Sequence, residues 1–403
     1  MASAKDFDAI ILLSNSRWDQ DLSSAAISLA REFSRNHRVF FIDQPYTLKD
    51  VISNYRDFRV KNKWRAFLLG SSIYRFVVSG NRNLIAVTPY VTLPINWLPE
   101  GAVYQFFSRV NDWLLSRTLV RIVKEYKLKN FIFFNSYNPF YGLTLPGSFK
   151  PALYIYQSRD NIGESVYVSK HGPALEKKVS RRADLRLATS RDLVDKLSTP
   201  EYPFILLPNA ADVELFSKAS EAGGIPAELH QVAKPVIRYV GNICLRIDYD
   251  LLYKIALNFP AWTFLLVGPR NDAEYHKYNF EALKNVIFTG RKHIMELPDY
   301  LKLVDCAILP FKVNALTRSI YPLKINEYLA AGKPVVSTAF SPDIESFNGL
   351  VFLGKDHDSF IENIRKSVET DNESKKCQRM QAARQNSWSA RVEQFWNLVE
   401  TNS

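Results

Sequence analysis

The chain has 403 residues, of which 47% are hydrophobic and 13% aromatic, so it is long enough for two domains with a large core in each. Three distant cysteines without a CxxC pair argue against a disulfide framework and a thiolate zinc site, and six histidines without an HExxH spacing give no metal motif. No apolar run approaches about 18 residues, which predicts a soluble chain without a spanning helix or a classical signal peptide.

The excess positive charge lies in the first half of the sequence. Residues 1–210 hold 29 Lys and Arg against 18 Asp and Glu, whereas residues 211–403 hold 23 of each. The net charge of +11 therefore belongs to the first half. Such a basic half favours an anionic partner, which is a nucleic acid, an anionic membrane or a phosphorylated substrate.

Apolar periodicity predicts strands and helices in alternation, in two successive blocks. The strands expected in the first block are residues 9–13, 39–42, 76–78, 84–87, 131–134, 152–156, 185–188 and 204–207, and its helices include residues 21–33 and 103–126. The strands expected in the second block are residues 236–240, 263–267, 286–288, 306–309, 335–337 and 351–353. Strands that alternate with helices form parallel sheets covered on both faces. The sequence therefore predicts an α/β fold of two doubly wound, Rossmann-like domains.

The expected domains are residues 1–207 and residues 208–386, followed by a C-terminal helix within residues 387–403 that returns to the first domain. The turn after the first strand reads SNSRWD and contains no GxGxxG, so a dinucleotide site is disfavoured. Asp43 ends the next strand and is expected to be a turn or helix-cap residue. The chain also lacks GxxxxGK[ST], which disfavours a P-loop.

The densest chemical signal is the stretch NALTRSIYPLKINEYLAAGKPVV at residues 314–336. Pro322 fits the first position of a short helix and Gly332 fits its C-terminal end, so the helix N-terminus is directed out of the carboxyl edge of a parallel sheet, where anions bind. Lys324 opposes the helix dipole, a penalty that a bound diphosphate would reverse. Glu327 lies on the same helix face and can accept two ribose hydroxyls. A surface ion pair between Lys324 and Glu327 explains the spacing equally well.

Residues 317–336 resemble the donor-binding segment of GT-B glycosyltransferases of the family-4 type, which build bacterial cell-surface polysaccharides. Shorter stretches follow in the order of that family: PNAAD at residues 208–212, YVGN at 239–242, LVGP at 266–269, NVIFTG at 285–290 and LPDYL at 297–301. The resemblance covers residues 150–395 well, and the first 150 residues mainly by their strand–helix pattern. It implies two domains that face each other across a cleft, with the nucleotide-sugar donor in the second domain and the acceptor in the first.

The resemblance also implies a set of donor-binding residues in the second domain. They are Gly241, Asn242, Arg246, Gly290, His293, Thr317, Ser319, Lys324 and Glu327. The sequence departs from the family pattern at Ser319, which stands in place of the first of two glutamates, and at Asn242 and Ile247, where Arg and Lys are common. Arg246 is therefore the expected substitute cation. The xanthan-type glucuronosyltransferases are similar in using a Lys before a short helix.

Asp160 is the expected catalytic base, because it follows a strand whose end faces the presumed cleft. In similar enzymes this strand end reads YD..D, and Asp160 matches the last acid. The alternative is that Asp160 pairs with Arg159 or caps a turn. Asp19, after the first strand, is the second catalytic candidate.

Four DxD triplets occur, but Asp248 and Asp356 stand before helical runs, where Asp is a favoured cap. We expect no metal and no cofactor, because helix N-termini and Lys324 can neutralise a leaving diphosphate.

Residues 56–69 carry five cations among aromatic side chains. The segment suits a membrane surface or a lipid diphosphate, and it also suits single-stranded nucleic acid or an ordinary solvated loop and helix. The membrane interpretation predicts anionic lipid at Arg59, Lys61, Lys63 and Arg65, with Phe58, Trp64 and Phe67 in the interface.

The sequence and the resemblance together predict a metal-independent hexosyl- or glycuronosyltransferase. Its donor is expected to be a UDP- or GDP-linked sugar, and its acceptor a saccharide, expected to be lipid-linked, at the inner face of the cytoplasmic membrane. One alternative is a nucleotide-sugar 2-epimerase of the same fold. The other is a nucleic-acid-binding protein that uses the basic half, but without an RRM, KH or helix-turn-helix signature we expect no nucleic-acid partner.

Overall fold

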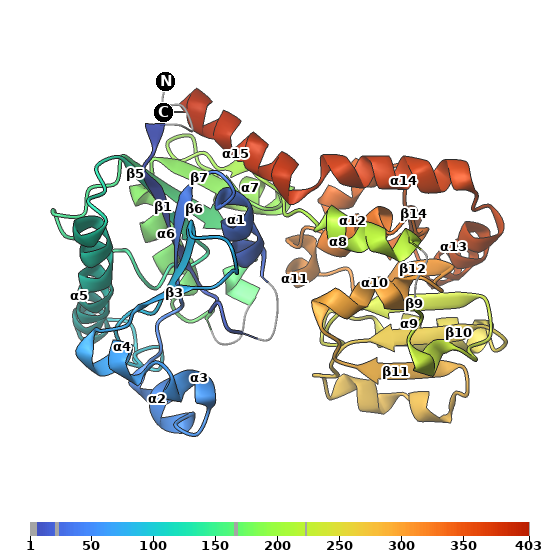
Figure 1. Ribbon diagram of the computed structural model, residues 1–403. Helices are drawn as coiled ribbons and strands as arrows, with labels where there is room; N and C mark the ends of the chain where they lie inside the picture. Colours follow the sequence, from blue (N-terminus) through green and yellow to red (C-terminus); the bar gives the residue numbers. More distant parts are fainter. Residues whose placement is uncertain (1–5, 21–23, 165–167, 222–223, 403) are drawn as a thin grey trace. The chain divides into compact units, whose positions relative to one another are not determined.

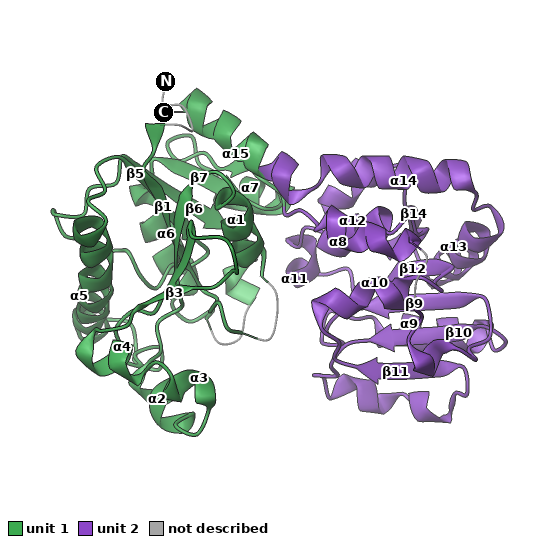
Figure 2. Cartoon of the chain, in the orientation of Figure 1, with its two compact units in different colours: residues 1–208, 392–403 green, residues 209–391 purple. Residues whose placement is uncertain are grey.

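The computed structural model describes residues 6–20, 24–164, 168–221 and 224–402. The chain divides into two compact units (Figure 2), of which unit 1 comprises residues 1–208 and 392–403 and unit 2 comprises residues 209–391. The sequence predicts divisions after residues 207 and 386, and the structure divides the chain after residues 208 and 391.

Unit 1 (Figure 1) contains an eight-stranded sheet, and its strands follow the order β3-β4-β2-β1-β5-β6-β7-β8. Its strands are β1 (Ala9–Ser14), β2 (Arg38–Ile42), β3 (Tyr74–Phe76), β4 (Leu84–Val87), β5 (Phe131–Ser136), β6 (Leu153–Ser158), β7 (Leu185–Ala188) and β8 (Ile205–Leu206). All neighbouring strands are parallel except β3 and β4, which are antiparallel. The chain leaves β1 for β2 on one side and later returns as β5 on the other. The carboxyl ends of β1 and β5 therefore flank a topological switch point.

The strand expected at residues 76–78 is present two residues earlier, as β3 at Tyr74–Phe76. The chain then turns through Gly80, whose φ is 77°, and enters β4. Residues 77–80 form this reversal and so cannot pair with β4. The other expected strands are confirmed to within two residues at each end. The helix expected at residues 21–33 is found at Ala25–Phe33, and residues 21–23 lie outside the described residues.

Helices cover both faces of the unit 1 sheet. The helices of this unit are α1 (Ala25–Phe33), α2 (Leu48–Ser53), α3 (Phe58–Lys61), α4 (Trp64–Leu69), α5 (Ala102–Glu125), α6 (Gly172–Arg182), α7 (Arg191–Leu197) and α15 (Trp388–Asn402), of which α15 begins in unit 2. On one face, Leu119 of α5 and Val179 of α6 share a buried cluster with Phe133 of β5. On the other face, the ring of Phe33 in α1 lies 4.8 Å from that of Phe395 in α15. This two-sided burial is what a parallel sheet requires.

Unit 2 contains a six-stranded, wholly parallel sheet in the order β11-β10-β9-β12-β13-β14. Its strands are β9 (Val236–Val240), β10 (Thr263–Val267), β11 (Val286–Gly290), β12 (Cys306–Leu309), β13 (Val335–Thr338) and β14 (Phe352–Gly354). Its helices include α8 (Val213–Ser217), α9 (Tyr249–Asn258), α10 (Leu297–Leu301), α11 (Ala315–Arg318), α12 (Leu323–Ala330), α13 (His357–Glu369) and α14 (Glu373–Gln385). The chain runs outward from β9 to β11 and returns beside β9 as β12, so the switch point lies between β9 and β12.

Asp248 and Asp356 are confirmed as helix caps. The Asp248 side chain accepts the N–H of Leu251 at the start of α9, and Asp356 forms a capping box with Ser359 at the start of α13. Both triplets therefore serve helix ends in unit 2.

Candidate functional site

The candidate site of unit 2 is built on the turns that follow β9 and β12, at the switch point of the sheet. Ligands of open parallel sheets bind in the crevice outside the carboxyl ends of the strands at such a point. The turn after β9 begins at Gly241, and the segment after β12 runs through α11 into α12. The two stretches that the sequence singles out thus lie at one edge of one sheet.

Gly241 allows Lys324 to lie across the turn after β9. Its φ is 143°, and its N–H donates to the carbonyl oxygen of Val267 at 2.9 Å. A Cβ at this position would lie 2.5 Å from Cε of Lys324 and 2.8 Å from Oη of Tyr239. A Cβ on Gly268 would lie 1.9 Å from the Gly241 carbonyl oxygen. The two glycines therefore let the turns after β9 and β10 touch and leave room for the lysine.

Helix α12 presents Lys324 in its first turn and Glu327 one turn later. Pro322 stands at the N-cap, one position before the N1 position expected from the sequence, and Gly332 follows the Ala331 C-cap with a φ of 71°. In the described part of the chain no ion pair joins Lys324 to Glu327, so the alternative of a surface pair is not realised there.

Glu327 is partly withdrawn from solvent beside a buried arginine. Burial raises the pKa of the Glu327 carboxyl, and the nearby Lys324 and Arg238 cations oppose that rise. Arg238 is fully buried in β9, and its burial lowers its pKa to about 9. Among the described residues its Nε and Nη2 atoms have no hydrogen-bond partner. A desolvated carboxylate near two cations is suited to accept hydroxyl donors from a ligand.

Thr317 and Ser319 are fully buried, with no exposed surface on either residue. The Thr317 hydroxyl donates to the carbonyl oxygen of Lys312, and the residue forms a capping box with Asn314 at the start of α11. In this structure the Thr317 hydroxyl therefore holds the segment after β12 in shape.

The remaining expected donor residues lie along the same sheet edge. Asn242 is exposed, and its carbonyl oxygen accepts the Tyr239 hydroxyl at 3.1 Å. The carbonyl oxygen of Arg246 accepts the Lys312 N–H at 2.8 Å, which ties the turn after β9 to the segment after β12. Gly290 ends β11, two strands from β9 and hence about 10 Å away. His293 caps the short helix that follows, with Nδ1 accepting the N–H of Met295.

In unit 1, Asp160 follows the carboxyl end of β6 and is partly exposed. Burial lowers the pKa of the neighbouring Arg159, and the attraction of Asp160 opposes that change. Gln157, which replaces the first acid of the family pattern, is buried and accepts the Ser136 hydroxyl at 2.9 Å. The structure therefore leaves Asp160 as the carboxylate at this strand end, in electrostatic contact with Arg159.

Asp19 and Asp43 belong to a cluster of charges that the sequence does not reveal. Lys63, only 4% exposed, places Nζ 2.7 Å from Asp19 and 3.5 Å from Asp43. Arg75 lies 2.6 Å from Asp43, which also accepts the N–H of Trp18 at 2.8 Å. Burial raises the pKa of Asp43, and the two cations oppose the rise. Asp43 is thus a buried ion-pair partner, and its expected role as a turn or cap residue is wrong.

The cluster also corrects the membrane hypothesis for one cation and one aromatic ring. Lys63 faces the two carboxylates inside unit 1, and Phe67 is buried against Tyr46 at a ring distance of 5.3 Å. Arg59 pairs with Asp57 at 3.0 Å. No periodic pattern identifies the pairs of Lys63, because Asp19 lies in the turn after β1 and Asp43 directly after β2, both far from Lys63 in the sequence.

Residues 234–370 match the family described as glycosyl transferases group 1. The matched range includes the turns after β9 and β12, Lys324 and Glu327, so the family match falls on the candidate site. A protein of Bacillus subtilis (strain 168), named for a teichuronic acid biosynthesis glycosyltransferase, is 34% identical over 170 residues. That match covers 40% of this chain and only 42% of the relative.

Solved structures share the fold of the chain over both units. A sucrose-phosphate synthase from Thermosynechococcus elongatus superposes with a TM-score of 0.66 at 14% identity, covering 98% of both chains. The Anabaena protein HepE, in a complex with UDP, superposes with a TM-score of 0.66 at 14% identity, and the match covers 98% of this chain and all of the HepE chain. A trehalose-6-phosphate protein from E. coli, bound with UDP-2-fluoro glucose, superposes with a TM-score of 0.67 at 10% identity, and the match covers 98% of this chain and 99% of the E. coli chain. The chain has the two Rossmann-like units of the GT-B fold, as the sequence predicts.

Proposed function

We propose that the protein is a glycosyltransferase that moves a sugar from a nucleotide-diphosphate donor to a saccharide in cell-surface polysaccharide synthesis. The observation that carries the proposal is Lys324 lying across Gly241, within the residues that match glycosyl transferases group 1 and one helical turn from Glu327. The UDP and UDP-sugar complexes of the Anabaena and E. coli structures support UDP as the donor nucleotide.

Each candidate residue has a chemical role in this proposal. The positive end of the α12 dipole and the Lys324 ammonium hold the donor diphosphate and stabilise its charge as the sugar–phosphate bond breaks. Glu327 accepts the ribose hydroxyls. Asp160 takes the proton from the acceptor hydroxyl that forms the new glycosidic bond. No step requires a metal or a cofactor.

The acceptor proposal rests on the named relative and on the surface of unit 1. The Bacillus relative is named for teichuronic acid biosynthesis, which supports a cell-surface polysaccharide as the product. In the described residues no helix is long and apolar enough to cross a membrane. We propose that unit 1 holds a lipid-linked acceptor at the inner face of the cytoplasmic membrane, through helices α2–α4.

The donor site is tested by Lys324→Ala and Glu327→Ala in the full chain. Each loses a charge-assisted contact worth roughly 1.5–3 kcal/mol, so UDP affinity should fall by about tenfold or more in each variant. Isothermal titration calorimetry with UDP measures the loss, and circular dichroism melting checks the fold. Lys284→Ala and Glu369→Ala, exposed elsewhere in unit 2, are the matched controls. Equal UDP affinity in all five proteins would remove this site.

A transfer assay separates the proposal from the epimerase alternative. The proposed enzyme should form a glycosidic product from a UDP-sugar only when a saccharide acceptor is added. Release of a free sugar or of an epimer without an acceptor would instead support the epimerase.

A further inference from the structure

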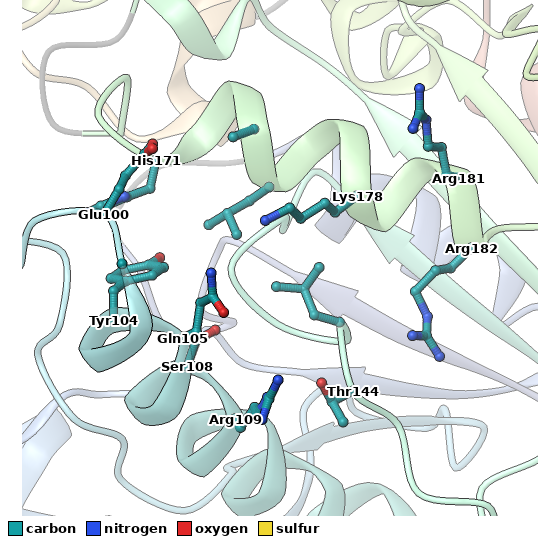
Figure 3. A pocket seen from close by; sticks show the side chains of 14 residues that line it. Glu100, Tyr104, Gln105, Ser108, Arg109, Thr144, His171, Lys178, Arg181 and Arg182 are labelled. Carbon is teal, nitrogen blue, oxygen red and sulfur yellow. The ribbon is translucent and has the colours of Figure 1, made fainter.

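A cavity of about 470 Å³ lies in unit 1 between α5 and α6 (Figure 3). Its volume is that of a site for a small ligand. The connection from β5 to β6, residues 137–152, contains no helix. No helix of this connection therefore fills the space between α5 and α6. Leu143 and Thr144 of this connection line the cavity instead.

The walls of the cavity are fixed by buried contacts. Asp112 of α5, 2% exposed, accepts the N–H groups of Gly142 and Thr144, both at 2.8 Å. His171, at the start of α6, places Nε2 3.0 Å from the carbonyl oxygen of Leu98 and stacks on Tyr104 with ring centroids 4.0 Å apart. Three segments of the chain are therefore tied together around the space before any ligand enters.

Cations from both walls face this space. Arg109 of α5 and Arg182 and Lys178 of α6 line the cavity, with Glu100 as an acid at its rim. Figure 3 shows the side chains of Arg109 and Lys178 pointing into the space from opposite sides. In the described part of the chain neither side chain has a hydrogen bond or an ion pair. Arg181 points away in the same view, and its guanidinium lies over Tyr202 at 5.2 Å.

Convergent cations without protein partners, held on rigid walls, favour an anionic ligand. A concave site of one sign raises the local concentration of opposite charge. The planar guanidinium of Arg109 matches two oxygens of a phosphate, and the Lys178 ammonium adds a point charge. Gln105 and Ser108 of α5 and Thr144 of the connection after β5 supply hydrogen-bonding groups for hydroxyls.

We propose that this cavity binds the phosphate group of a phosphorylated saccharide. The inference goes beyond the proposed function, because it assigns unit 1 a second anion site outside the residues that match glycosyl transferases group 1. Such a phosphate comes either from a soluble sugar phosphate or from the head group of a lipid-linked saccharide. The shared chemistry is a phosphate ester next to sugar hydroxyls.

The test uses the full chain with saturating UDP, which keeps phosphate probes away from the donor site. Glucose 6-phosphate is titrated by calorimetry, and neutral-lipid vesicles with and without a polyprenyl diphosphate sugar are assayed by sedimentation. The double variant R109Q/K178Q should bind at least one phosphate probe about tenfold more weakly than wild type. The matched control K150Q/K177Q removes two exposed lysines that do not line the cavity and should bind as wild type does. Glucose should bind to none of the proteins.

The probe whose binding is weakened by R109Q/K178Q identifies the source of the phosphate, which is a soluble sugar phosphate for glucose 6-phosphate and a lipid head group for the vesicles. Equal binding of both probes to the two double variants, or no binding of either probe to wild type, would overturn the proposal. UDP affinity is measured separately on the same proteins, so a failed donor site and a failed cavity site give different results.

Discussion

At the scale of single residues, some charged side chains of unit 1 have an oppositely charged partner within the protein and others do not. Lys63 is committed to Asp19 and Asp43, and Arg75 is committed to Asp43. Removing one partner of such a buried pair leaves an uncompensated charge, so these residues hold the turns after β1 and β2 together. Asp19 thus stabilises the fold around the switch point, and Asp160 is the first choice for the base.

We predict that Asp160→Asn lowers the rate of sugar transfer by about two orders of magnitude or more, with UDP affinity unchanged. A general base acts in the transition state, so its loss lowers turnover without weakening donor binding. The rate of UDP release in the presence of acceptor measures the effect. Glu164→Gln, an exposed acid close by in the sequence, is the control. Turnover near that of wild type would move the role to Asp19, which Asp19→Asn then tests.

At the scale of elements, helices α2–α4 present an apolar and basic surface. Ile52, Phe58, Leu68 and Leu69 are between 67% and 76% exposed, and Trp64 is 49% exposed. The cations exposed with them are Lys49, Arg56, Lys61 and Arg65. Apolar side chains beside cations are the features of helices that lie in the interface of an anionic membrane. The structure therefore moves the membrane hypothesis from Lys63 and Phe67 to these exposed side chains.

The membrane prediction is that wild type co-sediments with vesicles rich in anionic lipid and is released by high salt. Each Lys or Arg near such a surface contributes about 1 kcal/mol, so reversing Arg56, Lys61 and Arg65 to Glu should abolish binding. The control variant reverses Lys129, Lys150 and Lys177, which are exposed elsewhere in unit 1, and so has the same net charge as the first triple variant. It should retain much more of the vesicle binding. Lys63 is left intact, because its reversal would disrupt the buried cluster.

Two results would contradict a membrane surface at α2–α4. One is equal partitioning of wild type to neutral and anionic vesicles. The other is an equal loss of binding in the two charge-reversed triple variants, which would show that only the net charge matters.

At the scale of the whole molecule, the buried Glu176 connects the stability of unit 1 to pH. Its Oε1 accepts the hydroxyls of Tyr156 at 2.9 Å and Ser158 at 2.8 Å, and burial raises its pKa to about 7. The folded state therefore holds a proton that the unfolded state has released between about pH 4.5 and pH 7. The free energy of unfolding falls as pH rises through this window, by about 3 kcal/mol in total from this group.

We predict that Glu176→Gln is more stable than wild type at pH 8 and loses less stability between pH 5 and pH 8. Glutamine keeps a carbonyl oxygen for both hydroxyls and carries no charge to desolvate. Urea unfolding of the unit 1 transition at the two pH values measures the difference. Glu164→Gln should follow wild type. Parallel pH dependence in Glu176→Gln and wild type would contradict the buried titration.

The sequence by itself determines the two blocks of strands and helices, because apolar periodicity and cap residues are local. It also identifies the stretch around Lys324 and Glu327, since a lysine in the first turn of a helix opposes the dipole wherever the helix lies. The caps at Asp248 and Asp356 follow from the same local chemistry. Most strand ends are accordingly predicted to within two residues.

Only the tertiary structure decides which of these residues meet. Lys324 reaches Gly241 because the return of the chain beside β9 brings the segment after β12 to the turn after β9. Lys63 is buried in ion pairs with Asp19 and Asp43. Arg109 faces Lys178 across the cavity. Charge pairing and cavity formation join residues distant in sequence, and such contacts have no period that a linear pattern can display.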